Sequence, residues 1–182
     1  MRITGGQFRN LYINPPNAEG LRPLPERERL ALFSMLGSVI GIKVVDLFAG
    51  SGIVALEFLS RGASEAIAVE LNRQLCRFMR DQSAKWAVNL KVVCGDVMRF
   101  LERQLDADMV FMGPPNNKGY VAKVLDRLYS LGYRGIIIVQ RSHKEPLPTY
   151  AKVLRTTGKD ESIIDIITLD FGGGEESASG GS

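Results

Sequence analysis

The stretch Asp46-Leu47-Phe48-Ala49-Gly50-Ser51-Gly52 decides how the chain is expected to fold. The apolar run at residues 43–48 predicts a short strand that ends in this stretch, and residues 53–61 beyond it predict a helix. Two glycines allow the backbone to turn tightly and to approach a ligand without a clash against a Cβ atom. A strand, a glycine turn and a helix in this order predict a ligand site at the carboxyl end of the first strand.

The same alternation of strand and helix continues along the chain. Further strands are predicted at residues 66–71, 90–94, 108–112 and 134–140, and further helices at residues 26–39, 72–86, 97–103 and 120–131. Residues 150–155 and 162–169 predict two strands that pair as a hairpin across residues 157–160. The pattern favours an α/β, Rossmann-like fold, with a mostly parallel seven-stranded sheet, helices on both faces and a C-terminal antiparallel hairpin. Right-handed crossovers then bring the carboxyl ends of the parallel strands to one edge.

The two ends of the chain differ from this middle part in composition. Residues 1–25 are rich in Gly, Asn and Pro, and residues 7–13 could form a short strand, so we expect an N-terminal hairpin-like arm. Residues 26–171 form the expected domain. Residues 172–182, rich in Gly, Glu and Ser, are expected to be a flexible tail.

Composition narrows the class of protein. With 182 residues, 45% of them hydrophobic and 24% charged, the chain suits one globular domain. No apolar run reaches the roughly 18 residues of a membrane span, and the N-terminus lacks a signal peptide, so we expect a cytoplasmic monomer without a membrane partner. Cys76, Cys94 and His143 show no zinc-ligand spacing, so no metal site is expected. Reduced cysteines are expected, with a disulfide between them as the alternative.

Charge is distributed unevenly. The net charge is +3, but all 23 Lys and Arg residues lie within residues 1–159, and residues 160–182 carry six acids and no base. A basic body suits a polyanion such as RNA, although a solvated basic surface would give the same pattern.

Two cofactor classes are compatible with the glycine turn. Gly50-x-Gly52-x-x-Ala55, with Glu70 on the next strand, also fits the fingerprint of nicotinamide dinucleotide enzymes. The second class is S-adenosylmethionine, and Asp46 favours it. The carboxylate of Asp46 would repel a pyrophosphate but attract the ammonium and sulfonium of S-adenosylmethionine. The carboxylate of that cofactor can bind the N–H groups of the turn.

The turn resembles motif I of the class I methyltransferases. Val69-Glu70 is similar to their motif II, and Gly95-Asp96 resembles the position whose acid binds the adenine amino group. The resemblance implies that S-adenosylmethionine is the cofactor. It implies a binding set of Asp46, Phe48, Ala49, Gly50, Gly52, Glu70, Leu71, Asp96 and Val97.

The N-terminal sequence is more specific. Residues 1–9 (MRITGGQFR), Arg22-Pro23, residues 27–33 (RERLALF) and residues 60–63 (SRGA) resemble the bacterial 16S ribosomal RNA guanine-N2 methyltransferase family, the RsmD type. The resemblance implies methyl transfer to the exocyclic N2 amine of a guanine in 16S ribosomal RNA, either free or in the small ribosomal subunit.

The resemblance also implies an RNA-contacting arm and first helix. Their basic residues are Arg2, Arg9, Arg22, Arg27 and Arg29. Phe8 and Tyr12 could stack on an unpaired base. The alternative is that these arginines are solvated and the two rings pack on the sheet.

The loop after the fourth strand departs from the family pattern. Such enzymes usually carry Asp/Asn-Pro-Pro-Tyr/Phe there, and this chain carries Gly113-Pro114-Pro115-Asn116 as its expected catalytic loop. Gly113 has no side chain to accept a hydrogen bond from the target amine, and Asn116 has no ring to stack on the base. Gln140 stands where the family usually has an acid. Two interpretations follow: a working enzyme with a variant loop, or a cofactor-binding but catalytically impaired relative that serves as an RNA-binding or ribosome-assembly factor.

Overall fold

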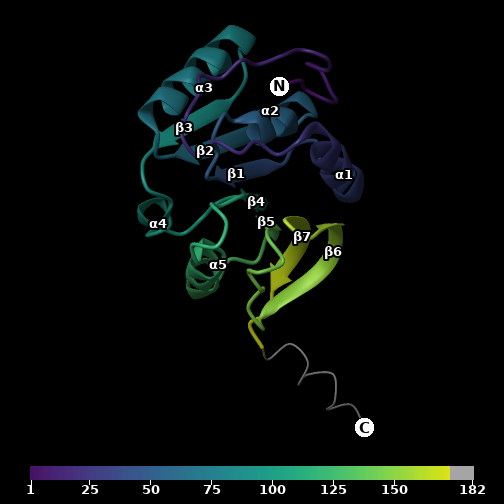
Figure 1. Ribbon diagram of the computed structural model, residues 1–182, viewed down its shortest axis with the longest axis vertical. Helices are drawn as coiled ribbons and strands as arrows, with labels where there is room; N and C mark the ends of the chain where they lie inside the picture. The colour runs from purple at the N-terminus through teal and green to yellow at the C-terminus, as the bar shows by residue number, and fades with distance from the viewer. Residues whose placement is uncertain (173–182) are drawn as a thin grey trace.

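The computed structural model describes residues 1–172, within which five helices and seven strands alternate (Figure 1). The helices are α1 (Glu26–Leu36), α2 (Ile53–Ser60), α3 (Arg73–Trp86), α4 (Val97–Phe100) and α5 (Tyr120–Ser130). The strands are β1 (Lys43–Leu47), β2 (Glu65–Glu70), β3 (Leu90–Cys94), β4 (Met109–Met112), β5 (Ile136–Arg141), β6 (Ala151–Lys159) and β7 (Ser162–Leu169).

The strands form one sheet in the order β3-β2-β1-β4-β5-β7-β6. β1 to β5 are parallel to one another, and β7 runs antiparallel to both β5 and β6. The predicted fold is therefore confirmed, including the C-terminal hairpin. The turn of that hairpin is tighter than predicted, because β6 continues to Lys159 and only Asp160 and Glu161 separate the strands.

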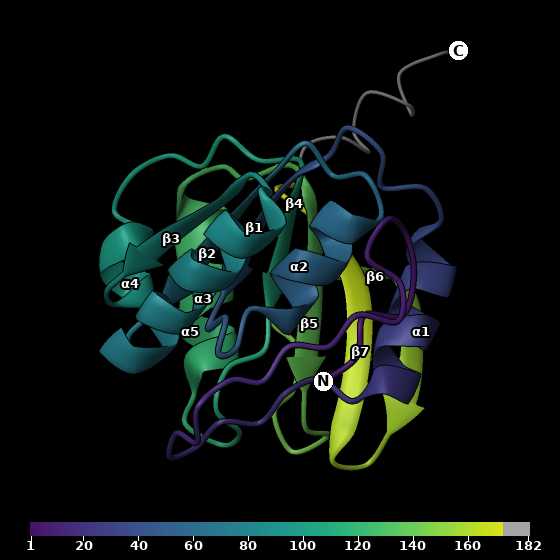
Figure 2. The ribbon, with the colours of Figure 1, turned by 90° about the horizontal axis from the view of Figure 1, so that it is seen from above.

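Helices cover both faces of the sheet, as Figures 1 and 2 show. α1, α2 and α3 lie on one face, and α4 and α5 lie on the other. Each face has its own hydrophobic core: one cluster includes Phe33, Phe58 and Phe111, and the other includes Leu125 and Ile137. The carboxyl ends of the parallel strands are thereby held rigidly at one edge.

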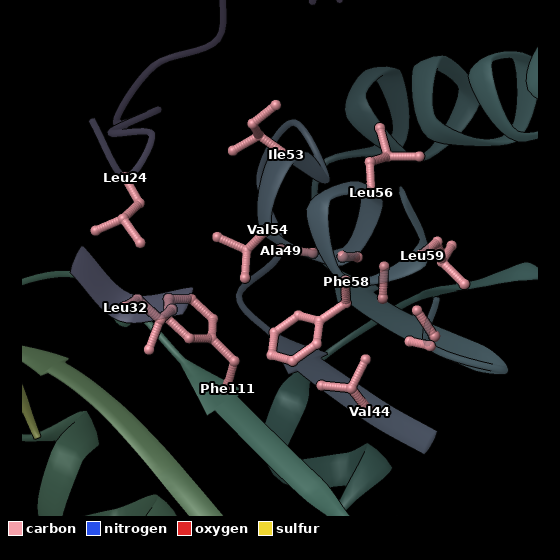
Figure 3. Close-up of a cluster of buried hydrophobic side chains, with 14 of the residues drawn as sticks. Leu24, Leu32, Val44, Ala49, Ile53, Val54, Leu56, Phe58, Leu59 and Phe111 are labelled. Carbon is pink, nitrogen blue, oxygen red and sulfur yellow. The ribbon is translucent and has the colours of Figure 1, made fainter. Parts of the chain in front are cut away.

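α2 is the most deeply buried helix, because every one of its residues is buried. Its side chains Val54 and Phe58 point toward Val44 of β1 and Phe111 of β4 (Figure 3). This helix begins directly after the glycine turn, so its packing also fixes the turn.

Two helix ends follow from local chemistry. Asn72 caps α3, as predicted, because its side chain accepts a hydrogen bond from the Leu75 N–H at 3.0 Å. α1 ends at Leu36 instead of residue 39, since Gly37 takes a positive φ of 71° and its N–H closes the last turn on Phe33.

The N-terminal arm is hairpin-like but contains no strand at residues 7–13. Its two sides are joined by hydrogen bonds from Ile3 N–H to the Leu11 carbonyl and from Ile13 N–H to the Met1 carbonyl, each 2.8 Å long. Residues 7–10 form a turn, which the periodicity did not reveal. Ile3 and Ile13 are buried in the same core as α2, so the arm is packed against the domain.

Three other expectations concern the cysteines, the tail and the membrane. The expectation of reduced cysteines is wrong, because a disulfide joins Cys76 of α3 to Cys94 of β3 across a Cα–Cα distance of 5.8 Å. The tail expected at residues 172–182 lies, apart from Gly172, outside the described residues. Within residues 1–172 no helix is both long and apolar enough to span a membrane.

Candidate active site

A cavity of about 960 Å³ opens at the carboxyl edge of the parallel strands. Residues 19–24 of the arm line it, together with the glycine turn after β1 and residues at the carboxyl ends of β2, β3, β4 and β5. All four expected catalytic residues line this cavity, as do all expected cofactor residues except Gly52. The sequence thus identified the residues that the fold brings together.

Glycine is required at two positions of the turn. Gly50 and Gly52 have positive φ angles of 59° and 82°. A Cβ atom at Gly52 would lie 2.8 Å from the Met79 sulfur, and one at Gly50 would lie 2.9 Å from a Leu21 methyl carbon. Gly52 therefore allows α2 and α3 to pack closely below the turn, and Gly50 keeps the cavity wall open.

Asp46 has a buried carboxyl group that is only half satisfied. Its Oδ2 accepts a hydrogen bond from the Ala55 N–H at 3.2 Å, and its Oδ1 is buried without a hydrogen-bond partner within residues 1–172. Burial raises the pKa of Asp46 to about 8. A buried carboxyl group with a free oxygen beside a cavity is suited to bind a cation.

Two further acids stand at the ends of the neighbouring strands. The Glu70 carboxylate accepts hydrogen bonds from the N–H groups of Gly50 and Asn72, both 2.8 Å long, and is thereby held in one orientation. Asp96 accepts a hydrogen bond from the Arg99 N–H at 3.0 Å and caps α4. Carboxylate oxygens have further lone pairs, so both acids can still accept hydrogen bonds from hydroxyl or amino groups of a ligand.

The loop after β4 is fixed by residues of β5, of the segment that follows β5 and of β7. The Asn117 N–H donates a hydrogen bond to the buried Glu145 carboxylate, and Arg141 holds the Glu145 carbonyl at 3.0 Å while pairing with Asp165 at 2.7 Å. Asp108 cannot replace the missing acid at position 113. It lies just before β4, at the amino ends of the parallel strands, where it accepts a hydrogen bond from the Lys43 N–H at 2.9 Å.

Aromatic side chains form part of the cavity wall. Phe48 and Tyr120 meet edge to face with ring centroids 5.3 Å apart, and both line the cavity. Asn116 also lines it but contributes no ring. These walls provide apolar surface against which a planar ligand can pack.

The expected RNA contact of Arg29 is wrong. Its side chain is 3% exposed, forms an ion pair with Glu57 and donates hydrogen bonds to the carbonyl groups of Leu24 and Arg2. The family resemblance implied that Arg29 contacts RNA, but the arm covers this part of α1. Arg2 is half-exposed and paired with Glu26.

The other expected RNA contacts have mixed surroundings. Arg9, Arg22 and Arg27 are exposed. Phe8 stacks on Trp86 with ring centroids 4.9 Å apart, so it packs on the protein, whereas Tyr12 is 64% exposed.

One basic cluster was not identified from the sequence. Arg73, Arg77 and Arg80 of α3 are exposed and line a hollow of about 440 Å³ together with Asp81 and Cys94. The hollow adjoins the large cavity, since Arg73 follows Asn72 and Cys94 precedes Gly95. Their spacing of four and three residues places them along one face of a helix, and this was the signal that could have revealed them.

Comparison with known proteins decides the family. The family model described as "Conserved hypothetical protein 95" matches residues 1–168. Ribosomal RNA small subunit methyltransferase D of Escherichia coli K12 is 34% identical over 155 residues, which cover 82% of this chain and 78% of that protein. The chain belongs to the RsmD family.

Solved structures agree with this RsmD-family assignment. Escherichia coli protein yhhF superposes with a TM-score of 0.84 at 28% identity, covering 93% of this chain and 98% of its own. An RNA methyltransferase of Salinibacter ruber, solved with S-adenosyl-L-homocysteine, has a TM-score of 0.68 at 15% identity, over 83% of this chain and 95% of its own. At that identity, the second likeness shows the fold alone.

The cavity of this RsmD-family chain fits S-adenosylmethionine. The unpaired Asp46 Oδ1 suits an ammonium group, and the glycine turn exposes backbone without Cβ atoms to a carboxylate. Glu70 and Asp96 provide acceptors for a ribose and an adenine amino group. A pyrophosphate would instead meet the Asp46 carboxyl group, so the dinucleotide alternative fits less well.

Proposed function

We propose that this chain is an S-adenosylmethionine-dependent methyltransferase of ribosomal RNA, and that its target is the N2 amine of a guanine in 16S RNA. The observation that carries the proposal is the unpaired buried oxygen of Asp46 at the glycine turn, which lines the same cavity as the loop Gly113-Pro114-Pro115-Asn116. A site for a cationic cofactor and a loop suited to an amine thus share one space. The names of the relatives support RNA methylation.

Some residues of the cavity bind the cofactor, and others position the target base. Asp46, Glu70 and Asp96 bind and orient the cofactor, whose sulfonium supplies an electrophilic methyl carbon when bound. The Gly113–Asn116 loop holds the base so that the lone pair of its amine points at that carbon. A nitrogen–carbon bond forms as the carbon–sulfur bond breaks, and the amine releases one proton to water. No strong base is required, since the methylated amine loses its proton readily.

Substrate positioning supplies most of the catalysis in this account. The lone pair of a guanine amine is delocalised into the ring, so the amine is a weak nucleophile, and the rate depends on alignment. The buried Glu145 and the half-buried Arg141, which fix the loop, contribute to this alignment. The alternative of an impaired relative acting as an assembly factor is not favoured, because the curated relatives are named as methyltransferases.

The proposal is tested by identifying the modified nucleoside. The protein is incubated with S-adenosylmethionine and small ribosomal subunits that lack the modification, and the RNA is then digested and analysed by mass spectrometry. We expect N2-methylguanosine at one position. Methylation of another base or another guanine atom would contradict the proposed target while leaving RNA methylation intact.

The RNA-binding surface extends from the arm to α3. We propose that Arg9, Arg22 and Arg27 contact phosphates, as expected from the sequence, and that Arg73, Arg77 and Arg80 continue this surface beside the cavity. The arm at residues 1–25 thus carries part of the proposed RNA-binding surface. Its action as a monomer in the cytoplasm stays a prediction, which light scattering and cell fractionation can check.

Removing the three α3 arginines is expected to weaken RNA binding. In the R73A/R77A/R80A variant, affinity for 16S RNA falls about tenfold or more, and the slope of log affinity against log salt becomes shallower by about 2. Filter binding over a salt series measures both. The matched control is K152A/R155A/K159A, which removes the same charge from β6 at the opposite edge of the sheet. Equal losses of RNA affinity in the two variants would show a non-specific charge effect and contradict the proposed RNA-binding surface.

A further inference from the structure

The space left by the absent side chain at position 113 is filled from the neighbouring strand. β4 and β5 are parallel with Met112 opposite Val139, so Gly113 and Gln140 are the next neighbours across the two strands. A Cβ atom at Gly113 would lie 2.8 Å from Gln140 Oε1. Both residues line the cavity, and Gln140 is half-buried. The amide oxygen of Gln140 therefore stands where a longer side chain at position 113 would begin.

We propose that Gln140 is a catalytic residue that accepts a hydrogen bond from the guanine amine in place of the acid missing at Gly113. The proposal rests on the methyltransferase function proposed above. A side-chain amide carries one acceptor oxygen and two N–H donors. Its oxygen accepts from the N2 amine of guanine, and its N–H group donates to the adjacent ring nitrogen N3. This pairing orients the amine lone pair toward the methyl carbon and recognises guanine.

Gln140 orients the amine without taking its proton. A neutral amide is not a base at neutral pH, so the proton released from the amine passes to water at the mouth of the cavity. A hydrogen bond that the amine donates to a neutral amide oxygen is weaker than one that it donates to a carboxylate. The enzyme consequently keeps alignment of the target but has less charge beside the reacting nitrogen than an acid would provide.

The size of residue 113 and the position of Gln140 are coupled in this arrangement. Gly113 has no positive φ, so the backbone accepts other residues there, and the clash of a Cβ atom is with the end of a flexible side chain. A side chain at position 113 would displace the Gln140 amide. Glycine at position 113 therefore removes an acceptor side chain, but it also leaves the space that the Gln140 amide occupies.

The kinetic test compares four variants after calorimetry has confirmed that each binds S-adenosylhomocysteine. Q140A lowers the methyl-transfer rate constant on the order of 10²-fold at unchanged cofactor affinity. Q140E retains a rate within about tenfold of the unaltered protein, because it keeps an acceptor in place. Gly113→Asp placed in the Q140A background restores transfer, whereas Gly113→Ala in the otherwise unaltered chain lowers it. An unchanged rate in Q140A would overturn the proposal while the methyltransferase function stands.

A binding experiment tests the contact independently of turnover. The side-chain amide signal of Gln140, assigned by its loss in Q140A, is followed by nitrogen-15 NMR with S-adenosylhomocysteine present. Guanosine monophosphate is expected to shift this signal, and inosine monophosphate, which lacks the N2 amine, is expected to shift it much less. Equal shifts with guanosine and inosine monophosphate would overturn the contact. So would an unchanged Gln140 signal while guanosine monophosphate shifts the signals of other cavity residues. Neither outcome depends on whether methyl transfer is observed.

Discussion

Replacing Glu57 by alanine is expected to lower the free energy of unfolding by about 3–5 kcal/mol, the cost of leaving a buried charge unpaired. Glu57 lies fully buried on α2 and accepts hydrogen bonds from the Thr4 N–H at 2.7 Å and the Thr4 hydroxyl at 2.8 Å. It also pairs with Arg29 at 3.4 Å and Arg61 at 3.3 Å. Without it, the buried Arg29 guanidinium keeps only the carbonyl groups of the arm.

The loss should release the arm as well as lower stability. Arg29 and Thr4 connect the arm to α1 and α2 through Glu57, and residues 19–24 at the end of the arm line the active-site cavity. Urea unfolding measures the free energy, and limited proteolysis reports cleavage within residues 1–25. E26A is the matched control, because it removes a half-exposed partner of Arg2 in a solvent-screened ion pair and should lower stability far less. Similar losses in E57A and E26A would contradict the central role of Glu57.

Replacing Asp46 by asparagine is expected to lower the affinity for S-adenosylmethionine about 10- to 100-fold, because a charge-assisted hydrogen bond of roughly 1.5–3 kcal/mol is lost. The variant should also remove the proton release that accompanies binding. In the cofactor-free protein the pKa of Asp46 is about 8, so at pH 7 most molecules hold a proton there. An α-ammonium group, with a pKa of roughly 8, is still charged at pH 7 and favours the ionised carboxylate. Binding therefore releases nearly one proton per molecule.

The same pKa shift determines how stability varies with pH. The pKa in the folded chain lies above the ordinary aspartate value of 3.8, so the unfolded chain loses this proton near pH 4 and the folded chain retains it up to about pH 8. The stability of the cofactor-free protein consequently decreases as pH rises from about 4 to about 8, and this decrease is smaller in D46N.

Calorimetry in buffers of different ionisation enthalpy measures the released proton directly. D108N is the control, since Asp108 lies at the amino ends of the parallel strands, away from the cavity at their carboxyl ends. If D46N bound S-adenosylmethionine with undiminished affinity or released as many protons, the ammonium group of the cofactor would bind elsewhere.

The sequence predicted those parts of the molecule that depend on short-range patterns. The glycine turn, the cap at Asn72 and the acids at the strand ends are local, and the fold places Asp46, Glu70 and Asp96 around one cavity as expected. The parallel pairing of β1 to β5 follows from the alternation of strands and helices together with the handedness of their connections. These features need no knowledge of distant contacts.

Features that depend on distant contacts were either missed or left open between alternatives. Arg29 looks like any surface arginine in the sequence, and only the packing of the arm over α1 buries it beside Glu57. The Cys76–Cys94 disulfide and the stacking of Phe8 on Trp86 also join separate elements. The neighbourhood of Gly113 and Gln140 requires the register of β4 against β5, which no periodicity reveals.

The most direct measurement is the transfer of a labelled methyl group from S-adenosylmethionine to unmodified small ribosomal subunits by the unaltered protein. A G113D/N116Y variant, which recreates the usual loop of the family, is measured beside it after both have been shown to bind cofactor. We expect the unaltered protein to transfer label to 16S RNA, because Gln140 and the fixed loop position the amine. Cofactor binding without transfer by the unaltered protein, combined with transfer by the variant, would contradict the account and identify a scaffold that has lost its chemistry.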